Sequence, residues 1–411
     1  MSEFFDAAEV RDPAEREADL FVRLPAFIAG AMAKAPGWAA FLDGLDPATV
    51  TDRAALARLP VLRKSVLMAA QKALPPFGGF VAGAPGAFGR VFMSPGPIWE
   101  PQGAGADPWA GARALHAAGF SAGDIVHNAF AYHLTPGGYI LDAGAQALGC
   151  AVFPAGVGNT EAQLEAISVL KPAGYTGTPD YLKVLLDKGA ETGVDVSSIT
   201  RGLVSGGALF PSLREEYASR GVAVLQCYAT ADLGVIAYES EAREGMIVNE
   251  DFIVEIVRPG TNEPVAAGEV GEVVVTTFNP VYPLIRFGTG DLSALMPGTS
   301  PCGRSNMRVK GWMGRADQRT KVKGMFVDPA QIDAIVKRHG KIARARLTIT
   351  RQDEQDRMVL EIESATQDAA FLDAVAATMR DVLKLKGETV RRDVGSLPND
   401  GKVVSDERDY N

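Results

Sequence analysis

The sequence is poor in cysteine, because its 411 residues include only Cys150, Cys227 and Cys302. An odd, scattered set excludes a disulfide framework and favours reduced thiols in the core. Long uncharged apolar runs are also missing, so we expect no membrane partner. The beginning, residues 1–6, lacks the basic start and apolar run of a signal peptide, which predicts a cytoplasmic location.

An excess of basic residues is missing as well. The formal net charge is -9 and the sequence pI is about 5.2. Such a chain cannot replace the counterions on phosphate backbones, so we expect no nucleic-acid partner and favour small molecules instead. Hydrophobic residues make up 47% and charged residues 22%, which is typical of a globular protein, and the length predicts two or three domains.

Short apolar runs alternate with helical patterns in the middle of the chain. Expected strands cover residues 125–130, 150–153, 173–176, 202–205 and 222–227, and expected helices begin at Thr160, Pro179 and Pro211. At Thr160 the spacing to Gln163 predicts a capping box. This alternation indicates an α/β fold with a mostly parallel, helix-covered sheet.

The pattern changes towards the C-terminus. Strands expected at residues 251–257 and 271–278 predict a β-rich layer on the large domain. The part after Gly314 has strands near 343–350, 358–363 and 389–394 and a helix near 368–385, which indicates a small α+β unit. We therefore expect a large N-terminal domain, residues 1–316, and a small C-terminal domain, residues 317–411.

Four motifs follow one another along the chain. They are Tyr228-Ala-Thr-Ala-Asp232, Tyr282-Pro-Leu-Ile-Arg-Phe-Gly-Thr-Gly-Asp291, Gly314-Arg-Ala-Asp317 and Pro398-Asn-Asp-Gly-Lys402. Their order and spacing resemble the adenylate-forming acyl- and aryl-CoA ligases, and most closely the phenylacetate-CoA ligase family. The resemblance extends from about Pro75 to Lys402.

A carboxylate on a glycine-bounded loop can accept two hydrogen bonds from the vicinal hydroxyls of a ribose, and Asp291 suits that role. The resemblance assigns it the same role. It also implies that Arg315 is a catalytic arginine beside the nucleotide and that Asp317 is the hinge of the small domain. Each motif alone would favour an ordinary turn or loop.

Tyr228 to Asp232 follow an apolar strand, so we expect them on a loop at the carboxyl end of the sheet, where ligands bind in open α/β folds. The resemblance implies that Tyr228, Ala229 and Thr230 bind the nucleotide and that Asp232 holds Mg²⁺. It also implies that the loop at Ser205, Gly206, Gly207 and Ala208 binds adenine. As a lone motif, Ser-Gly-Gly is more often a turn.

Lys402 lies near the C-terminus, where lysines are usually solvated. Adenylation passes through a charge-rich transition state, and a cation delivered on a mobile domain can stabilise it. The family's terminal Gly-Lys matches Gly401-Lys402, so the resemblance implies that Lys402 is catalytic.

The segment from Ser94 to Glu100 departs from the family pattern. Family members carry a Ser/Thr/Gly-rich loop ending in lysine, which cradles the outer phosphates of ATP. Here two prolines remove amide donors, the lysine is absent, and Glu100 is expected to repel phosphate. The support that this loop gives to ATP chemistry is therefore left open.

Tyr132, Gly137 and Gly138 match the segment that lines the acid pocket in the family. An aromatic residue and a glycine pair that admits a flat ring suit an aryl carboxylate. We therefore predict an ATP-dependent ligase that activates a carboxylic acid, aromatic in our interpretation, as acyl-AMP and transfers it to CoA.

The expected cofactors are ATP, Mg²⁺ and CoA, and a homodimer is implied by the resemblance alone. Two alternatives stay open at this point. One is adenylation for the thiol of a carrier protein, and the other is a non-catalytic homologue that binds nucleotide or acyl-adenylate. The altered loop favours the second alternative, whereas Lys402 opposes it. The acid and the oligomeric state are not identified by the sequence.

Overall fold

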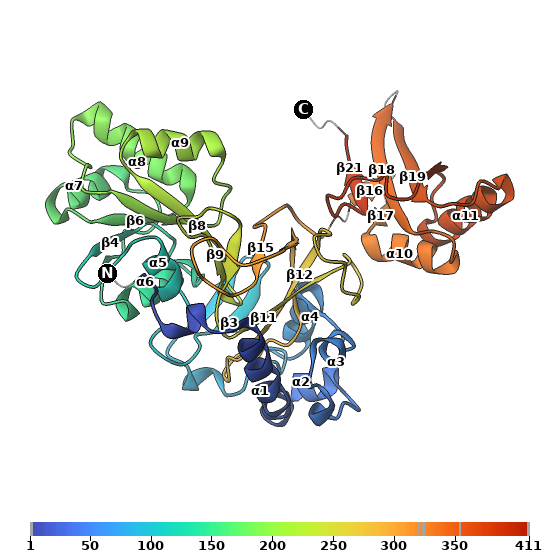
Figure 1. Ribbon diagram of the computed structural model, residues 1–411, viewed down its shortest axis with the longest axis horizontal. Coiled ribbons are helices and arrows are strands. Elements are labelled where there is room, and N and C mark those ends of the chain that lie inside the picture. Colours follow the sequence, from blue (N-terminus) through green and yellow to red (C-terminus); the bar gives the residue numbers. More distant parts are fainter. Residues whose placement is uncertain (1–2, 317, 319, 323–324, 353–354, 409–411) are drawn as a thin grey trace. The chain divides into compact units, whose positions relative to one another are not determined.

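The computed structural model describes residues 3–316, 318, 320–322, 325–352 and 355–408 (Figure 1). The chain packs into two compact units. The first comprises Met1–Val254, Val275–Thr289 and Leu295–Trp312, and the second comprises Glu255–Val274, Gly290–Ala294 and Met313–Asn411. These units are defined by packing and do not test a hinge, so the boundary expected at residue 317 stays a prediction.

The first unit begins with helices that the sequence analysis did not predict. The longest is α1 (Pro13–Lys34), where Asp12 caps the helix by accepting hydrogen bonds from the amides of Ala14 and Glu15. Leu20, Leu24 and Ile28 are buried at a four-residue spacing, so one apolar stripe faces the core. The shorter elements are η1 (Ala7–Val10), α2 (Pro36–Phe41), η2 (Pro47–Thr49), α3 (Arg53–Ala57), α4 (Lys64–Ala73) and η3 (Pro85–Ala87).

A nine-stranded sheet forms the centre of the first unit. Its order is β14-β15-β10-β9-β8-β7-β6-β4-β5. The strands are β4 (Ile125–Asn128), β5 (Ala151–Phe153), β6 (Gly174–Gly177), β7 (Arg201–Val204), β8 (Ala223–Thr230), β9 (Gly234–Tyr238), β10 (Met246–Val248), β14 (Leu295–Met296) and β15 (Arg308–Val309). Strands β5, β4, β6, β7 and β8 are parallel, as expected, and the remainder pair antiparallel.

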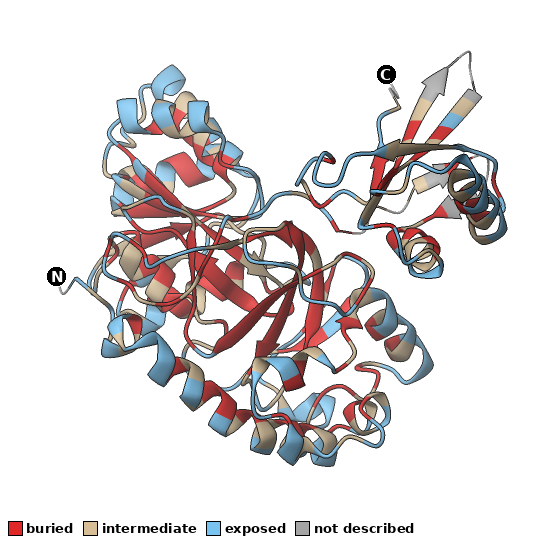
Figure 2. Ribbon diagram, turned by 45° about the vertical axis from the view of Figure 1, so that its right-hand side comes forward, coloured by how far each residue is buried: buried red, intermediate tan, exposed pale blue. Residues whose placement is uncertain are grey.

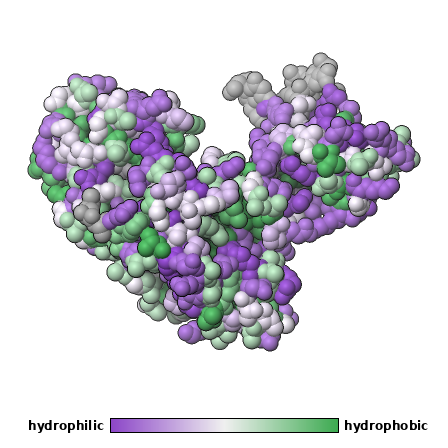
Figure 3. All heavy atoms as spheres, viewed as in Figure 1, coloured by the Kyte–Doolittle hydropathy of each residue, from purple (hydrophilic) through white to green (hydrophobic). Residues whose placement is uncertain are grey.

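Four helices connect the parallel strands of this sheet. They are α6 (Gly137–Ala147), α7 (Thr160–Leu170), α8 (Pro179–Thr192) and α9 (Pro211–Ser219), and α5 (Ala112–Ala117) precedes the first of these strands. Buried residues follow the strands, whereas exposed residues lie mainly on the outer faces of the helices (Figure 2). On the coloured surface in Figure 3, hydrophilic residues predominate and hydrophobic residues are scattered among them. The α/β fold class is thereby confirmed.

The capping box expected at Thr160 is wrong. Helix α7 begins at Thr160 itself, and the preceding Asn159 has a left-handed backbone with no side-chain cap. Gln163 instead binds the carbonyl oxygens of Gly156 and Gly158 and the imidazole of His127. The side chain thus fixes the loop before the helix rather than its first turn.

The β-rich layer expected after residue 246 is a four-stranded sheet in the order β1-β13-β12-β11. Its strands are β1 (Leu62–Arg63), β11 (Phe252–Val257), β12 (Gly271–Thr277) and β13 (Phe287–Ser293). A separate hairpin pairs β2 (Val91–Ser94) with β3 (Ile98–Pro101). This hairpin contains the segment in which the family's phosphate loop is altered.

The C-terminal part of the second unit has its own core. A four-stranded sheet in the order β20-β19-β18-β21 packs with two helices, and a short ladder joins two further strands. The elements are β16 (Thr320–Val322), β17 (Met325–Val327), α10 (Pro329–Arg338), β18 (Arg344–Gln352), β19 (Gln355–Glu363), α11 (Ala369–Leu383), β20 (Glu388–Arg392) and β21 (Val404–Asp406). The expected strands and helix are present, whereas α10 and the three-residue strands β16, β17 and β21 were not predicted.

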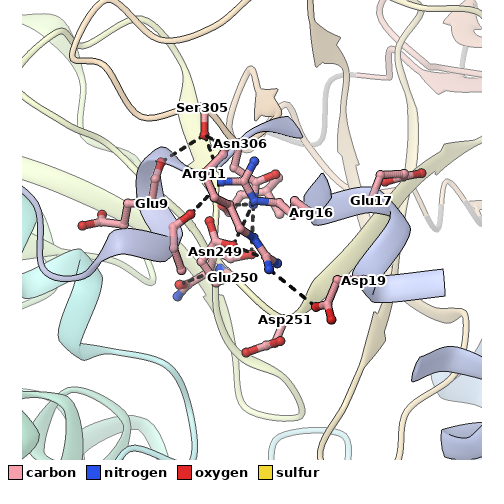
Figure 4. Close-up of polar contacts among 12 residues, drawn as sticks. Glu9, Arg11, Arg16, Glu17, Asp19, Asn249, Glu250, Asp251, Ser305 and Asn306 are labelled. Carbon is pink, nitrogen blue, oxygen red and sulfur yellow. Dashed lines mark hydrogen bonds and ion pairs between the residues drawn. The ribbon is translucent and has the colours of Figure 1, made fainter. Parts of the chain in front are cut away.

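A buried polar network links the N-terminal segment, residues 8–16, to the rest of the first unit (Figure 4). Arg16 Nε lies 2.9 Å from Glu250 Oε2, and both side chains are 4% exposed. Arg16 also donates hydrogen bonds to the carbonyl oxygen of Ala8 and to Ser305 Oγ, while Arg11 lies 3.8 Å from Glu250. Removal of one partner would leave a buried charge without compensation.

We therefore expect Glu250→Gln to lower the free energy of unfolding by about 3 kcal/mol, because Arg16 keeps its charge in a buried site. Denaturant unfolding at neutral pH measures the change. The matched control is Asp195→Asn, which breaks the exposed pair between Lys171 and Asp195 and should leave stability nearly unchanged. Equal effects of the two substitutions would contradict the importance of this network.

Candidate functional site

The loop expected to bind adenine follows β7 in the first unit. Ser205 Oγ donates a hydrogen bond of 2.8 Å to the carbonyl oxygen of Cys227, which ties the loop to the neighbouring strand β8. Gly206 has a φ of 72°, where a larger residue would be strained, and Gly206, Gly207 and Ala208 are exposed. The loop is thus anchored at one end and open to solvent beyond it.

The Tyr228 motif lies on the hairpin between β8 and β9. We expected a loop, but Tyr228, Ala229 and Thr230 belong to β8, because the antiparallel partner β9 extends that strand. The ladder has an irregularity between Tyr228 and Ala229. Thr230 Oγ1 accepts a hydrogen bond from the amide of Leu233 and so closes the turn that contains Asp232.

Asp232, the predicted metal ligand, is paired with a lysine that the sequence analysis missed. Lys64 Nζ lies 2.8 Å from Asp232 Oδ2, and the side chain of Asp232 is fully buried. Lys64 is the first residue of α4, far from Asp232 in the sequence. The only signal in the sequence was a lysine at the start of a helical pattern, and such a residue is usually solvated.

Glu100 lies inside the protein rather than on a phosphate-facing loop. Strand β3 points alternate side chains in opposite directions, so Trp99 is 40% exposed and Glu100 is 2% exposed. Gln71 of α4 fixes this register, because its side-chain amide accepts from the Trp99 amide at 2.8 Å and donates to the Trp99 carbonyl at 2.7 Å. A slip of one residue would break both hydrogen bonds.

Glu100, Asp232, Lys64 and Tyr282 form what we call the buried polar cluster. Burial raises the pKa of Glu100 well above its ordinary value of 4.5, and the Asp232 carboxylate raises it further, whereas Ser94 and Lys64 oppose the shift. Burial and the same two carboxyl groups also raise the pKa of Tyr282. Neither Glu100 oxygen nor the Tyr282 hydroxyl has a well-aligned hydrogen bond to a described residue.

The buried position of Glu100 bears on one expectation from the sequence. A raised pKa favours the protonated, uncharged carboxyl, which repels phosphate less than a carboxylate does. The cluster then combines the ion pair between Lys64 and Asp232 with the Tyr282 hydroxyl and a carboxyl whose ionisation is disfavoured.

A cavity of about 480 Å³ in the first unit reaches this cluster. Asp232 and Tyr282 line it, together with apolar residues that include Trp109, Phe252 and Phe278. Its volume falls in the range of small-molecule sites.

The segment predicted to line the acid pocket precedes and begins α6. Tyr132 donates a hydrogen bond of 2.8 Å to Asp142 Oδ2, and burial and this carboxylate raise its pKa. A Cβ on Gly138 would lie 2.8 Å from the Tyr132 ring, so the flat ring that Gly138 admits is that of Tyr132. Gly137 is half-buried and has no such close contact. Tyr132 also packs edge-to-face on Tyr139, which touches Phe92.

Two predicted nucleotide residues meet in the second unit. Arg315 Nη1 lies 2.9 Å from Asp291 Oδ1, and the two residues also form an isolated β-bridge. Asp291 lies within β13 rather than on the expected loop. Gly290 before it has a φ of 76°, and a Cβ there would lie 2.9 Å from Arg315 Nη2. Glycine therefore permits the ion pair.

Lys402 lies on an exposed loop of the second unit. Its amide donates a hydrogen bond of 3.0 Å to Asp400 Oδ1, and its side chain is exposed. Gly401 has a φ of 70°, and a Cβ there would lie 2.7 Å from Val270. The backbone of the predicted catalytic loop is thus fixed. The predicted hinge, Asp317, lies outside the described residues.

Comparison with known proteins places the chain in a family. The family model for AMP-binding enzymes matches residues 112–279. The chain is 31% identical to phenylacetate-coenzyme A ligase of Aromatoleum evansii over 336 residues, which cover 78% of this chain and 74% of that protein. The Escherichia coli phenylacetate-coenzyme A ligase is 32% identical over 291 residues, with coverages of 67% and 66%.

A crystal structure of 2-hydroxyisobutyryl-CoA ligase, in complex with 2-HIB-AMP and CoA in the thioesterification state, is similar along almost the whole chain. Its TM-score is 0.72 at 25% identity, and the match covers 99% of this chain and 93% of that one. The chain belongs to the phenylacetate-CoA ligase family of AMP-binding, adenylate-forming enzymes.

Proposed function

We propose that the chain is an ATP-dependent acid–thiol ligase, which activates a carboxylic acid as acyl-AMP and transfers the acyl group to CoA. One observation carries this proposal: the match over 99% of the chain to a ligase whose structure contains both an acyl-AMP and CoA. The phenylacetate-coenzyme A ligases share the same class of activity by name.

The nucleotide residues divide between binding and catalysis. Asp291 would accept hydrogen bonds from the ribose hydroxyls, and Arg315, which already lies on that carboxylate, would hold it ionised and in place. Tyr228 and the loop from Ser205 to Ala208 would hold adenine. Lys402 would supply a positive charge to the transition state of adenylation, when the phosphate oxygens carry most negative charge.

The buried polar cluster contains the type of ligand that Mg²⁺ prefers, the carboxylate of Asp232. Carboxylate oxygens are preferred magnesium ligands, and sites of this type usually combine one or two carboxylates with substrate phosphates. Asp232 would hold the ion, because its oxygens lack hydrogen-bond partners among the described residues apart from the ion pair with Lys64. Bound Mg²⁺ would neutralise charge on the phosphates of ATP.

The acid that we propose is aromatic. The support is the group of aromatic side chains around the start of α6, where Tyr139 contacts both Tyr132 and Phe92. Aromatic rings favour edge-to-face contacts with a flat substrate ring. The names of the relatives give two kinds of acid, the aromatic phenylacetate and the aliphatic 2-hydroxyisobutyrate. Aromatic acids should therefore be tested beside an aliphatic hydroxy acid.

The altered hairpin favours a second candidate, which is a homologue that binds nucleotide or acyl-adenylate without turnover. Its specific support is the position of Glu100 in the core, which leaves the hairpin without the lysine that family members direct at phosphates.

Pyrophosphate release distinguishes the candidates. We expect release with MgATP and at least one acid from a panel of aryl, arylacetyl and short hydroxy acids, and acyl-CoA only when CoA is present. Turnover that requires a carrier protein in place of CoA would contradict the proposal that CoA accepts the acyl group. No pyrophosphate release with any acid of the panel, together with retained AMP binding, would favour the second candidate.

The pKa of Glu100 gives a prediction for pH. The folded protein keeps the Glu100 proton above pH 4.5, whereas the unfolded chain releases it, so this group costs stability as pH rises towards its folded pKa. We expect Glu100→Gln, which cannot titrate, to become progressively more stable than the wild type as pH rises above the ordinary glutamate pKa of 4.5. Urea unfolding measures the difference. Parallel stability curves would show that Glu100 is ionised in the fold.

Lys402→Ala should separate the two half-reactions. We expect acyl-AMP formation to slow by a factor on the order of 10² or more, because an electrostatic partner of the transition state is removed. Acyl-CoA formation from presynthesised acyl-AMP should stay close to the wild-type rate. The matched control is Lys384→Ala, an exposed lysine at the end of α11. Normal adenylation with failed thioester formation would remove Lys402 from the first step.

A further inference from the structure

One glutamine side chain binds the loop on both sides of Lys402. Gln318 Nε2 donates a hydrogen bond of 2.7 Å to the carbonyl oxygen of Gly401. Gln318 Oε1 accepts two more, from the amide of Val403 at 2.5 Å and from the amide of Val404 at 2.8 Å. Three hydrogen bonds thus bracket Lys402 on both sides.

These contacts use the amide group almost fully. The oxygen of a glutamine can accept two hydrogen bonds, and both are made here. An acid would lose the donor to Gly401, and an apolar side chain of similar length would lose all three contacts. Since Gln318 is half-buried, water can replace them only in part.

The rest of the loop has separate anchors. Arg344 donates to the carbonyl oxygens of Leu397 and Pro398, and Arg346 pairs with Asp400. These contacts hold the residues before Lys402 to strand β18. Gln318 hydrogen-bonds to both neighbours of Lys402, while Asp400 binds the amide of Lys402 itself and the Leu347 amide binds the Val403 carbonyl oxygen.

We call the three hydrogen bonds of Gln318 the clamp. The position of Gln318 in the sequence places this clamp next to the expected hinge. It directly follows Asp317, the hinge that the family resemblance implies. Gln318 and residues 401–404 all follow Asp317 in the sequence, so the clamp lies wholly on the C-terminal side of that expected hinge. The clamp therefore sets the backbone next to Lys402 from a residue beside the expected hinge, whereas the lysine side chain stays exposed.

We propose that Gln318 is a positioning residue, which couples the hinge to the Lys402 loop and sets the place of the lysine for adenylation. This inference rests on the proposed catalytic role of Lys402. Adenylation depends on the position of a charge, and a displacement of about 1 Å in an active site can cost 10²-fold in rate. The thioester step, which does not use Lys402, is independent of the clamp.

The test compares Gln318→Met with a matched glutamine, Gln331→Met. Gln331 lies in the same part of the chain, where its Oε1 accepts a hydrogen bond from the Asp328 amide in the capping box of α10. We expect Gln318→Met to lower kcat for acyl-AMP formation on the order of tenfold or more. KM for ATP and for the acid, and thioester formation from presynthesised acyl-AMP, should change less than about twofold. Gln331→Met should leave all of these rates near the wild type.

Two further measurements keep the inference separate from the proposed function. Hydrogen exchange at the Val403 and Val404 amides should accelerate at least about tenfold in Gln318→Met, whether or not the protein turns over. Unchanged exchange, or equal slowing of both half-reactions, overturns the inference. If Lys402→Ala slows adenylation and Gln318→Met does not, the clamp fails while the function stands. If Gln318→Met does not fold, Gln318→Glu, which retains an acceptor for the two amides, is measured for the same split between half-reactions.

Discussion

The ion pair between Lys64 and Asp232 is the interaction on which the candidate site depends. A fully buried carboxylate costs several kcal/mol unless a cation compensates it, and Lys64 at 2.8 Å does so. Glu100 beside this pair ionises less easily than an exposed carboxyl, because it is buried and lies near the Asp232 carboxylate. The hairpin of β2 and β3 therefore directs Glu100 into the core, while its tip at residues 95–97 stays exposed and Gln71 holds its register.

This arrangement explains how an altered loop is compatible with a ligase. A charged Glu100 facing the triphosphate would oppose ATP, whereas a neutral, inward-facing Glu100 has little effect on it. Under the proposed function, recognition of the nucleotide would depend mainly on its AMP part. The proposed role of Lys402 would then matter more, because a transition state with fewer contacts to the hairpin depends more on other positive charge.

The sequence predicted the parallel strands, the main elements of the small α+β part and the family, because these depend on local periodicity and on short motifs. It did not predict Lys64, Gln71 or Gln318. Each acts on residues 28 to 168 positions away, and single-residue patterns carry no information on such pairings. The inward direction of Glu100 was missed for a related reason: strand alternation fixes a face only once the register of the hairpin is known.

The most direct test of a neutral, inward Glu100 is the ratio of ATP to AMP affinity, measured by calorimetry in the presence of Mg²⁺. We expect the two dissociation constants to agree within about threefold, which corresponds to less than about 0.7 kcal/mol, because the hairpin neither grips nor repels the outer phosphates. ATP affinity about tenfold or more above that of AMP would show a phosphate grip that we do not assign. ATP affinity as far below that of AMP would show a charged Glu100 facing the nucleotide, and would contradict the buried, neutral carboxyl.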